Sequence, residues 1–189
     1  DAKGLRAQAD EWVANVRPGA IGYLGSTFGI ADDGTFVIFA RFENEDAAKH
    51  NSARPEQGAW WEATTKFIDG EPTFRESSDV STLFEGGSDA AGFVQVMEGR
   101  VHDRVKADAM ETPALLAQLR AARPDLLGAT RVWFDGGTFA EAAYFTSEAD
   151  ARKGESSTEF AGPQEEYAAL FSEMTFIDLR DPQLSSPAA

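Results

Sequence analysis

The chain contains an internal repeat whose two copies lie 103 residues apart (127 − 24 = 103). The segment 24–49 aligns without a gap with the segment 127–152, and turn residues and apolar residues fall at the same positions in both. Eleven residues of the first copy are identical in the second: Leu24, Gly25, Thr27, Asp32, Gly34, Thr35, Phe36, Ala40, Phe42, Glu45 and Ala48. A shared spacing over this length indicates two copies of one folding unit.

Composition excludes several functional classes. The formal net charge of −15 and the pI near 4.4 argue against nucleic acid and anionic membrane partners, because both require clustered Lys and Arg. The absence of cysteine excludes disulfides, thiolate nucleophiles and Cys-based metal sites. Only two histidines are present, so we expect no metal site. No apolar run is long enough to span a bilayer, and we expect a cytoplasmic protein.

The second copy predicts the element order βαββαβ. Alternation of apolar and polar residues indicates strands, Thr112 and Ser147 are expected N-caps, and Asp135-Gly136-Gly137 is typical of a tight hairpin. The expected strands are 93–100, 127–134, 138–145 and 175–179, and the expected helices are 113–120, one from 148 and 164–171. We expect the final residues, 185–189, to form a disordered tail.

The first copy predicts the same order without the opening strand. We expect helices at 5–16, after the N-cap Asn44 and at 56–66, and strands at 23–30, 36–42 and 73–76. The missing strand is expected either in roughly a dozen residues ahead of Asp1 or from another chain, because an unpaired sheet edge is unfavourable. The predicted modules are 1–84 and 90–184, joined by a flexible Gly-containing linker at 84–89.

A βαββαβ unit forms a four-stranded antiparallel sheet with its helices on one face, a ferredoxin-like α+β fold. A two-residue turn at Asp33-Gly34 would place Phe28 opposite Phe39, and the same turn in the second copy would place Val132 opposite Glu141. The sheet faces without helices are apolar and must be covered. We therefore predict that the two sheets pack face to face as a single-chain pseudo-dimer.

The two hairpins, 24–42 and 127–145, together with the strand 93–100, resemble the dimeric α+β barrel superfamily. Within it, the chain resembles the antibiotic biosynthesis monooxygenase-like proteins, here as a fused tandem. The resemblance implies a small hydrophobic or aromatic ligand. The superfamily includes cofactor-free oxygenases, haem-dependent enzymes, isomerases and non-catalytic binding domains. Haem-degrading members use a His that follows a Trp, whereas His50 precedes Trp60, so no haem and no other cofactor is expected.

One candidate site lies in the first copy, where polar and aromatic residues have no counterpart in the second. His50 could donate or accept a proton, Asn51 and Arg54 could orient a ligand, and the aromatic rings of Trp60 and Trp61 could stack on it. The alternative is that the tryptophans belong to the core and that His50 and Arg54 lie on a solvated helix face.

Glu141 is the second candidate, because it replaces Ile38 of the first copy on a face that is otherwise apolar. A carboxylate there needs a partner or a raised pKa, and Thr130 is the hydroxyl expected nearby. Glu141 is either a general base in a cavity between sheet and helices or a carboxylate paired with an Arg or Lys. The corresponding functions are cofactor-free oxidation of an aromatic or enolisable substrate, and non-catalytic binding of a ligand or a protein.

Overall fold

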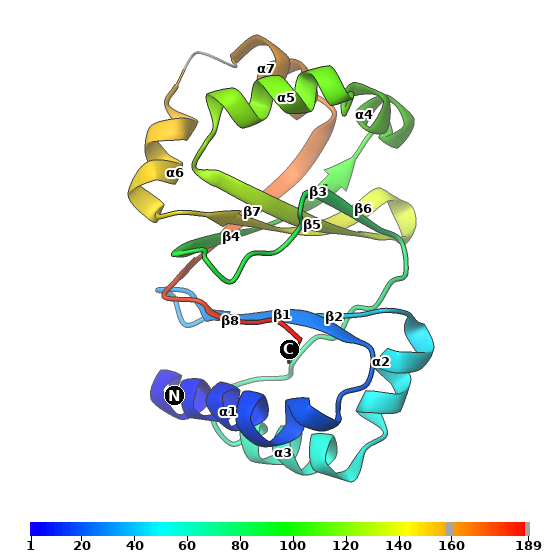
Figure 1. Ribbon diagram of the computed structural model, residues 1–189, viewed down its shortest axis with the longest axis vertical. Helices are drawn as coiled ribbons and strands as arrows, with labels where there is room; N and C mark the ends of the chain where they lie inside the picture. Colours follow the sequence, from blue (N-terminus) through cyan, green and yellow to red (C-terminus); the bar gives the residue numbers. More distant parts are fainter. Residues whose placement is uncertain (158–160, 188–189) are drawn as a thin grey trace. The chain divides into compact units, whose positions relative to one another are not determined.

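The computed structural model describes residues 1–157 and 161–187, which form two compact units (Figure 1). Unit 1 comprises residues 1–78 and the chain from Pro182 onward, and unit 2 comprises residues 79–181. Each unit has one antiparallel sheet with helices, so the predicted α+β class is confirmed. No helix in the described ranges is long and apolar enough to cross a membrane.

Unit 1 has a three-stranded sheet in the order β2-β1-β8. Its strands are β1 (Tyr23–Ile30), β2 (Phe36–Phe42) and β8 (Gln183–Ser185). Its helices are α1 (Ala2–Glu11), which continues as a π-helical turn over Trp12–Val16, α2 (Glu45–Ser52) and α3 (Pro55–Thr65). Residues Leu5 and Ala9 of α1 pack on Phe28 and Phe36, so the helices cover the face that carries these rings.

Unit 2 has a five-stranded sheet in the order β3-β5-β6-β4-β7. Its strands are β3 (Val80–Phe84), β4 (Phe93–Val101), β5 (Leu126–Phe134), β6 (Thr138–Phe145) and β7 (Phe171–Arg180). Its helices are α4 (Arg104–Met110), α5 (Pro113–Ala122), α6 (Glu148–Glu155) and α7 (Ala161–Ala168). Without β3, the strands follow the ferredoxin-like order, which is the predicted module.

The expected N-cap residues mark the starts of α2, α5 and α6. The side chains of Asn44, Thr112 and Ser147 accept hydrogen bonds from Ala47 N (2.9 Å), Leu115 N (3.2 Å) and Asp150 N (3.1 Å), as their expected N-cap roles require. The expected helix 164–171 is instead α7 at Ala161–Ala168, and Phe171 already belongs to β7. Helix α4 and strand β3 were not predicted.

The hairpin strands were predicted correctly, but their register was wrong by one residue. Phe28 lies opposite Ile38, and Arg131, not Val132, lies opposite Glu141. The reason is a three-residue loop in each hairpin, closed in the first copy by a bond from Ala31 N to Thr35 O of 2.8 Å. Gly34 has φ 89° and supplies the left-handed conformation that such a loop needs.

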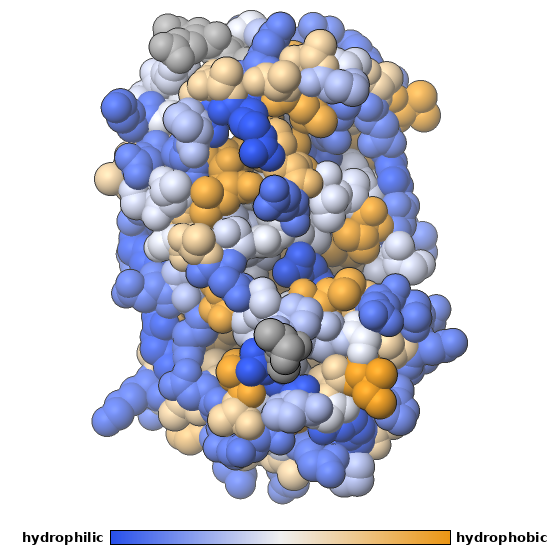
Figure 2. All heavy atoms as spheres, in the orientation of Figure 1, coloured by the Kyte–Doolittle hydropathy of each residue, from blue (hydrophilic) through white to orange (hydrophobic). Residues whose placement is uncertain are grey.

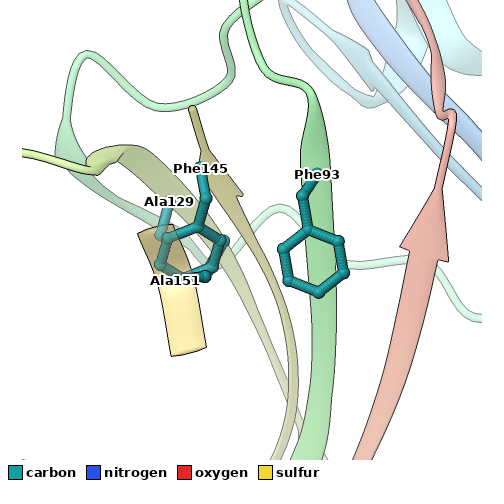
Figure 3. Packing of buried hydrophobic residues seen from close by; sticks show 5 residues of the cluster. Phe93, Ala129, Phe145 and Ala151 are labelled. Carbon is teal, nitrogen blue, oxygen red and sulfur yellow. The ribbon is translucent and has the colours of Figure 1, made fainter. Parts of the chain in front are cut away.

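Two apolar clusters of described residues lie on the helix-covered face of unit 2. Figure 3 shows the first, in which Phe93 and Phe145 extend to one side of the sheet, near Ala129 and Ala151 of α6. The second cluster comprises Val101, Ala107, Trp133, Phe139 and Leu170. In the face seen in Figure 2, hydrophobic residues form small separate groups among hydrophilic ones, in keeping with the net charge of −15.

The two repeats exchange their terminal strands. Strand β3 follows the first repeat yet pairs with β5 of the second, and β8 follows the second repeat yet pairs with β1 of the first. Val80 and Gln183, which begin these strands, are 103 residues apart (183 − 80 = 103). The two exchanged strands therefore begin at equivalent positions of the two repeats. The compact units therefore differ from the predicted modules 1–84 and 90–184.

Two predictions at the ends of the repeats were wrong. Residues 73–76 form no strand: the corresponding strand of unit 2, β7, pairs with β4, and the described part of unit 1 has no strand in that place. Ser185 does not begin a disordered tail, since it is buried in β8 and its carbonyl accepts a hydrogen bond from Tyr23 Oη at 3.2 Å. Residues 188–189 of that expected tail lie outside the described residues.

Candidate functional site

The predicted polar residues of unit 1 join its helices. Arg54 donates to Val16 O from both terminal nitrogens at 3.1 Å and to Asn51 Oδ1 at 2.9 Å. Asn51 is buried and donates to Gln57 Oε1 at 3.2 Å, which also accepts from Trp12 Nε1 at 2.8 Å. These contacts satisfy the Val16 carbonyl at the end of the first helical segment and join this segment to α2 and α3. The arrangement favours a structural role for Asn51 and Arg54.

The remaining candidates of unit 1 lie apart from this network or at its margin. Trp60 is half-buried and donates to Gln8 O at 2.7 Å, and its ring lies 5.9 Å from that of Trp61. Trp61 in turn contacts the exposed ring of Phe74 at 5.2 Å. His50 is exposed on the last turn of α2. The structure therefore brings Asn51 and Arg54 together but leaves His50 on the surface.

Glu141 lies on the helix-covered face of unit 2 and forms an ion pair with Arg131, its cross-strand neighbour. The side chains of Arg131 and Glu141 are only 13% and 9% exposed. The expected hydroxyl partner was wrong, because Thr130 lies opposite Ala142 and, by strand alternation, on the other face of the sheet. This correction follows from the one-residue register difference.

Glu111 and Tyr167 complete a cluster around this pair. Arg131 Nη1 donates to Glu111 Oε1 at 3.2 Å and to Tyr167 Oη at 2.9 Å, and the Tyr167 hydroxyl donates to Glu111 Oε1 at 2.6 Å. Glu111 lies between α4 and α5, and Tyr167 lies on α7. We call Arg131, Glu141, Glu111 and Tyr167 the ionic cluster.

The ionic cluster is set among aromatic rings. The guanidinium carbon of Arg131 lies 5.2 Å from the ring centre of Trp133 and 5.7 Å from those of Phe139 and Phe171. The ring of Tyr167 is at 5.9 Å. A cation among ring faces gains favourable electrostatic interaction, most where water is excluded. The site thus combines one buried positive charge with flat apolar surfaces.

The surroundings of Arg131 and Tyr167 determine their protonation states. Burial alone would lower the pKa of Arg131, but the nearby carboxylates outweigh it and raise the pKa, so the guanidinium stays charged. Burial raises the pKa of the Tyr167 phenol well above its usual value, with Arg131 opposing part of the effect. Tyr167 is therefore a neutral hydrogen-bond donor at neutral pH.

A separate hollow of about 240 Å³ lies in unit 2, away from the ionic cluster. Its lining residues are Glu85, Gly87, Ser88, Arg120, Pro124, Leu126 and Leu127. Within residues 1–157 and 161–187, no three His, Cys, Asp or Glu side chains lie together as metal ligands would.

Three of the four members of the ionic cluster, Arg131, Glu111 and Tyr167, were not predicted as site residues. The signal for Arg131 was present, because the repeat places it at the position of Phe28 just as it places Glu141 at that of Ile38. Two opposite charges that replace two cross-strand apolar partners indicate an ion pair once the register is known. Glu111 and Tyr167 reach the cluster through helix packing, which no local pattern encodes.

Comparison with known proteins supports the fold. No protein-family model and no curated protein sequence matches the chain. A solved structure of a candidate monooxygenase from Lactobacillus acidophilus aligns with 99% of this chain and 90% of its own, at 14% identity and a TM-score of 0.66. One from Fusobacterium nucleatum aligns over 99% and 88%, at 7% identity and a TM-score of 0.71. An anthrone oxidase-like protein aligns over 100% and 90%, at 11% identity and a TM-score of 0.62.

These likenesses cover both repeats in a single alignment. The sequence-based resemblance to a tandem of monooxygenase-like α+β modules is therefore confirmed at the level of the fold. Fold alone does not assign a reaction, since one fold hosts many chemistries.

Proposed function

We propose that the chain binds a small aromatic or enolisable molecule in unit 2 and oxidises it with O₂ without a cofactor. Two observations support this proposal. The chain shares its fold with candidate monooxygenases and an anthrone oxidase-like protein. Its ionic cluster places the buried guanidinium of Arg131 among four aromatic rings on the helix side of the sheet, and this is the observation that carries the assignment.

The positive charge of Arg131 suits the oxidation of a substrate that reacts as an anion. A phenol or an enolisable ketone becomes reactive towards O₂ as its anion, and a fixed cation in apolar surroundings stabilises that anion strongly. Arg131 supplies the cation, and a carboxylate of the ionic cluster accepts the proton. The buried position of Glu141 and the proximity of Glu111 favour these carboxylates over the exposed His50 as proton acceptor.

The overall reaction balances without a further reductant. An anthrone loses a proton from its CH₂ carbon, the resulting anion is oxidised by O₂, and the products are an anthraquinone and one water. The two C–H bonds of the CH₂ carbon are replaced by one C=O bond. The second oxygen atom of O₂ leaves as water together with both hydrogens. All four electrons come from the substrate, so O₂ and ketone are consumed in equal amounts.

A non-catalytic binding role is the second candidate, and one observation favours it. Glu141 is ion-paired with Arg131, an arrangement that holds the carboxylate against the guanidinium. In this case unit 2 would bind the ligand anion without turnover, and the helix-joining network of unit 1 would stabilise the fold.

Two measurements distinguish these functions. Anthrone binding is followed without O₂ by quenching of tryptophan fluorescence, with Trp133→Phe as the control because Trp133 is the tryptophan of unit 2. Oxygen uptake is then recorded with an electrode. We expect quenching that depends on Trp133, and uptake that Arg131→Met abolishes. Binding without uptake supports the non-catalytic role, and absence of both contradicts the proposal.

A further inference from the structure

We infer that Glu111 is a displaceable occupant of an oxyanion site, and that a carboxylate or phenolate oxygen of an aromatic ligand replaces its Oε1 atom. The inference deepens the proposed function and rests on it for the location of the ligand. The observation behind it is that two donors converge on this one oxygen, Arg131 Nη1 at 3.2 Å and the Tyr167 hydroxyl at 2.6 Å. Paired donors on one oxygen are the arrangement that binds oxyanions.

The two carboxylates of the ionic cluster are not equivalent. Glu141 lies within β6, with strands on both sides, and its side chain is 9% exposed. Glu111 is 30% exposed and meets only the outer end of the guanidinium. Because Glu111 is the more exposed of the two carboxylates, a ligand would enter along its side chain.

The backbone allows Glu111 to move without unfolding a helix. Its φ of −75° and ψ of 51° place it outside α4, and α5 begins separately with its own N-cap, Thr112. Among the contacts of the described residues, rotation of the Glu111 side chain therefore breaks only those to Arg131 and Tyr167. Both donors remain in position, since Arg131 is held by Glu141 and Tyr167 accepts from Arg131 Nη1 at 2.9 Å.

Charge balance selects an anion as the replacement. With both carboxylates ionised, one positive charge faces two negative charges, and loss of Glu111 leaves a neutral pair of Arg131 and Glu141. An incoming anion restores the original balance, whereas a neutral ligand leaves the two donors without their charged acceptor. The flat rings of Trp133, Tyr167 and Phe171 around the guanidinium favour an aromatic body on that anion.

The test compares benzoate with its neutral isostere benzamide on the full chain. Binding is measured by quenching of tryptophan fluorescence and by ligand-observed NMR for wild type, Glu111→Ala and Glu111→Gln. We expect Glu111→Ala to bind benzoate at least tenfold tighter than wild type, with Glu111→Gln intermediate and benzamide unchanged. Adding Tyr167→Phe to Glu111→Ala should remove much of the gain, because one of the two donors is lost.

The matched control is Glu165→Ala, which removes one negative charge from exposed α7 of the same unit. Equal gains for Glu165→Ala and Glu111→Ala, a gain shared by benzamide, or no gain in either Glu111 variant would overturn the inference. Benzoate is not oxidised in this assay. If no oxygen is taken up with anthrone, the proposed oxidation is contradicted, but the benzoate comparison is unaffected. If the Glu111 variants do not bind benzoate more tightly, the inference about Glu111 is contradicted, and the oxygen-uptake assay still tests the proposed oxidation.

Discussion

The repeat itself provides the substitution that tests the buried ion pair. Arg131 and Glu141 correspond to Phe28 and Ile38, which are cross-strand partners in unit 1. The double variant Arg131→Phe/Glu141→Ile therefore places in unit 2 an apolar pair that the same hairpin already accommodates in unit 1. We expect the two single substitutions to destabilise the protein and the double substitution to restore most of the loss.

The magnitudes follow from burial and from the remaining partners. Arg131→Phe leaves the buried carboxylate of Glu141 without its cation, which costs about 3–5 kcal/mol. Glu141→Ile leaves Arg131 its contact with Glu111 at 3.2 Å, so the cost is nearer to about 2 kcal/mol, the scale of one charged hydrogen bond. The double variant should lie within about 1 kcal/mol of wild type, since apolar replacements of buried ion pairs are close to neutral.

The assay is urea unfolding followed by far-UV circular dichroism. The three variants are compared using one common slope for the dependence of the unfolding free energy on urea concentration. The coupling free energy from the double-mutant cycle should then be several kcal/mol. Destabilisation of the double variant equal to the sum of the two single variants would refute the reasoning, because it would show that the charges do not interact. A stable double variant that no longer binds benzoate would assign the pair to ligand binding.

Three further outcomes are expected. Arg54→Ala should lower the free energy of unfolding by about 2 kcal/mol, measured by urea titration, because Val16 O loses charged donors, and should leave benzoate binding in unit 2 unchanged. Because the folded-state pKa of Tyr167 is raised, stability should be full below about pH 10 and decline above it, and Tyr167→Phe should weaken this decline in thermal melts at pH 9–11.5; an unchanged slope would contradict it. Gly128→Ala should destabilise the β3–β5 pairing, because a Cβ there would lie 2.2 Å from Gly86 O; native amide-exchange protection in β3 would argue against this.

Strand positions were predictable because alternation is a local property. The bounds of β1, β2 and β6 agree with the sequence pattern, as do the three side-chain N-caps. Register was not predictable to the same degree, because it depends on whether the loop holds two residues or three. The glycines at 34 and 136–137, all with positive φ, were the available signal for the longer loop.

The site was only partly predictable for a similar reason. Glu141 could be identified because an acidic residue replaces an apolar one in an aligned repeat. The identity of its partner depends on the register, and a register wrong by one residue places Thr130 near Glu141 instead of Arg131. In the first copy, the polar residues departed from the repeat because they join helices, and departure from a repeat does not distinguish packing from ligand binding.

The exchange of β3 and β8 has a consequence for biosynthesis. Residues 79–181 are continuous in sequence, so all five strands of that sheet are present once residue 181 has left the ribosome. The sheet of unit 1 is completed later, because Thr27 of β1 pairs with Leu184 of β8, which follows residue 181. The sheet that is translated first is thus completed last, and a chain interrupted between Arg180 and Gln183 would have one complete sheet and one sheet with an unpaired edge at β1.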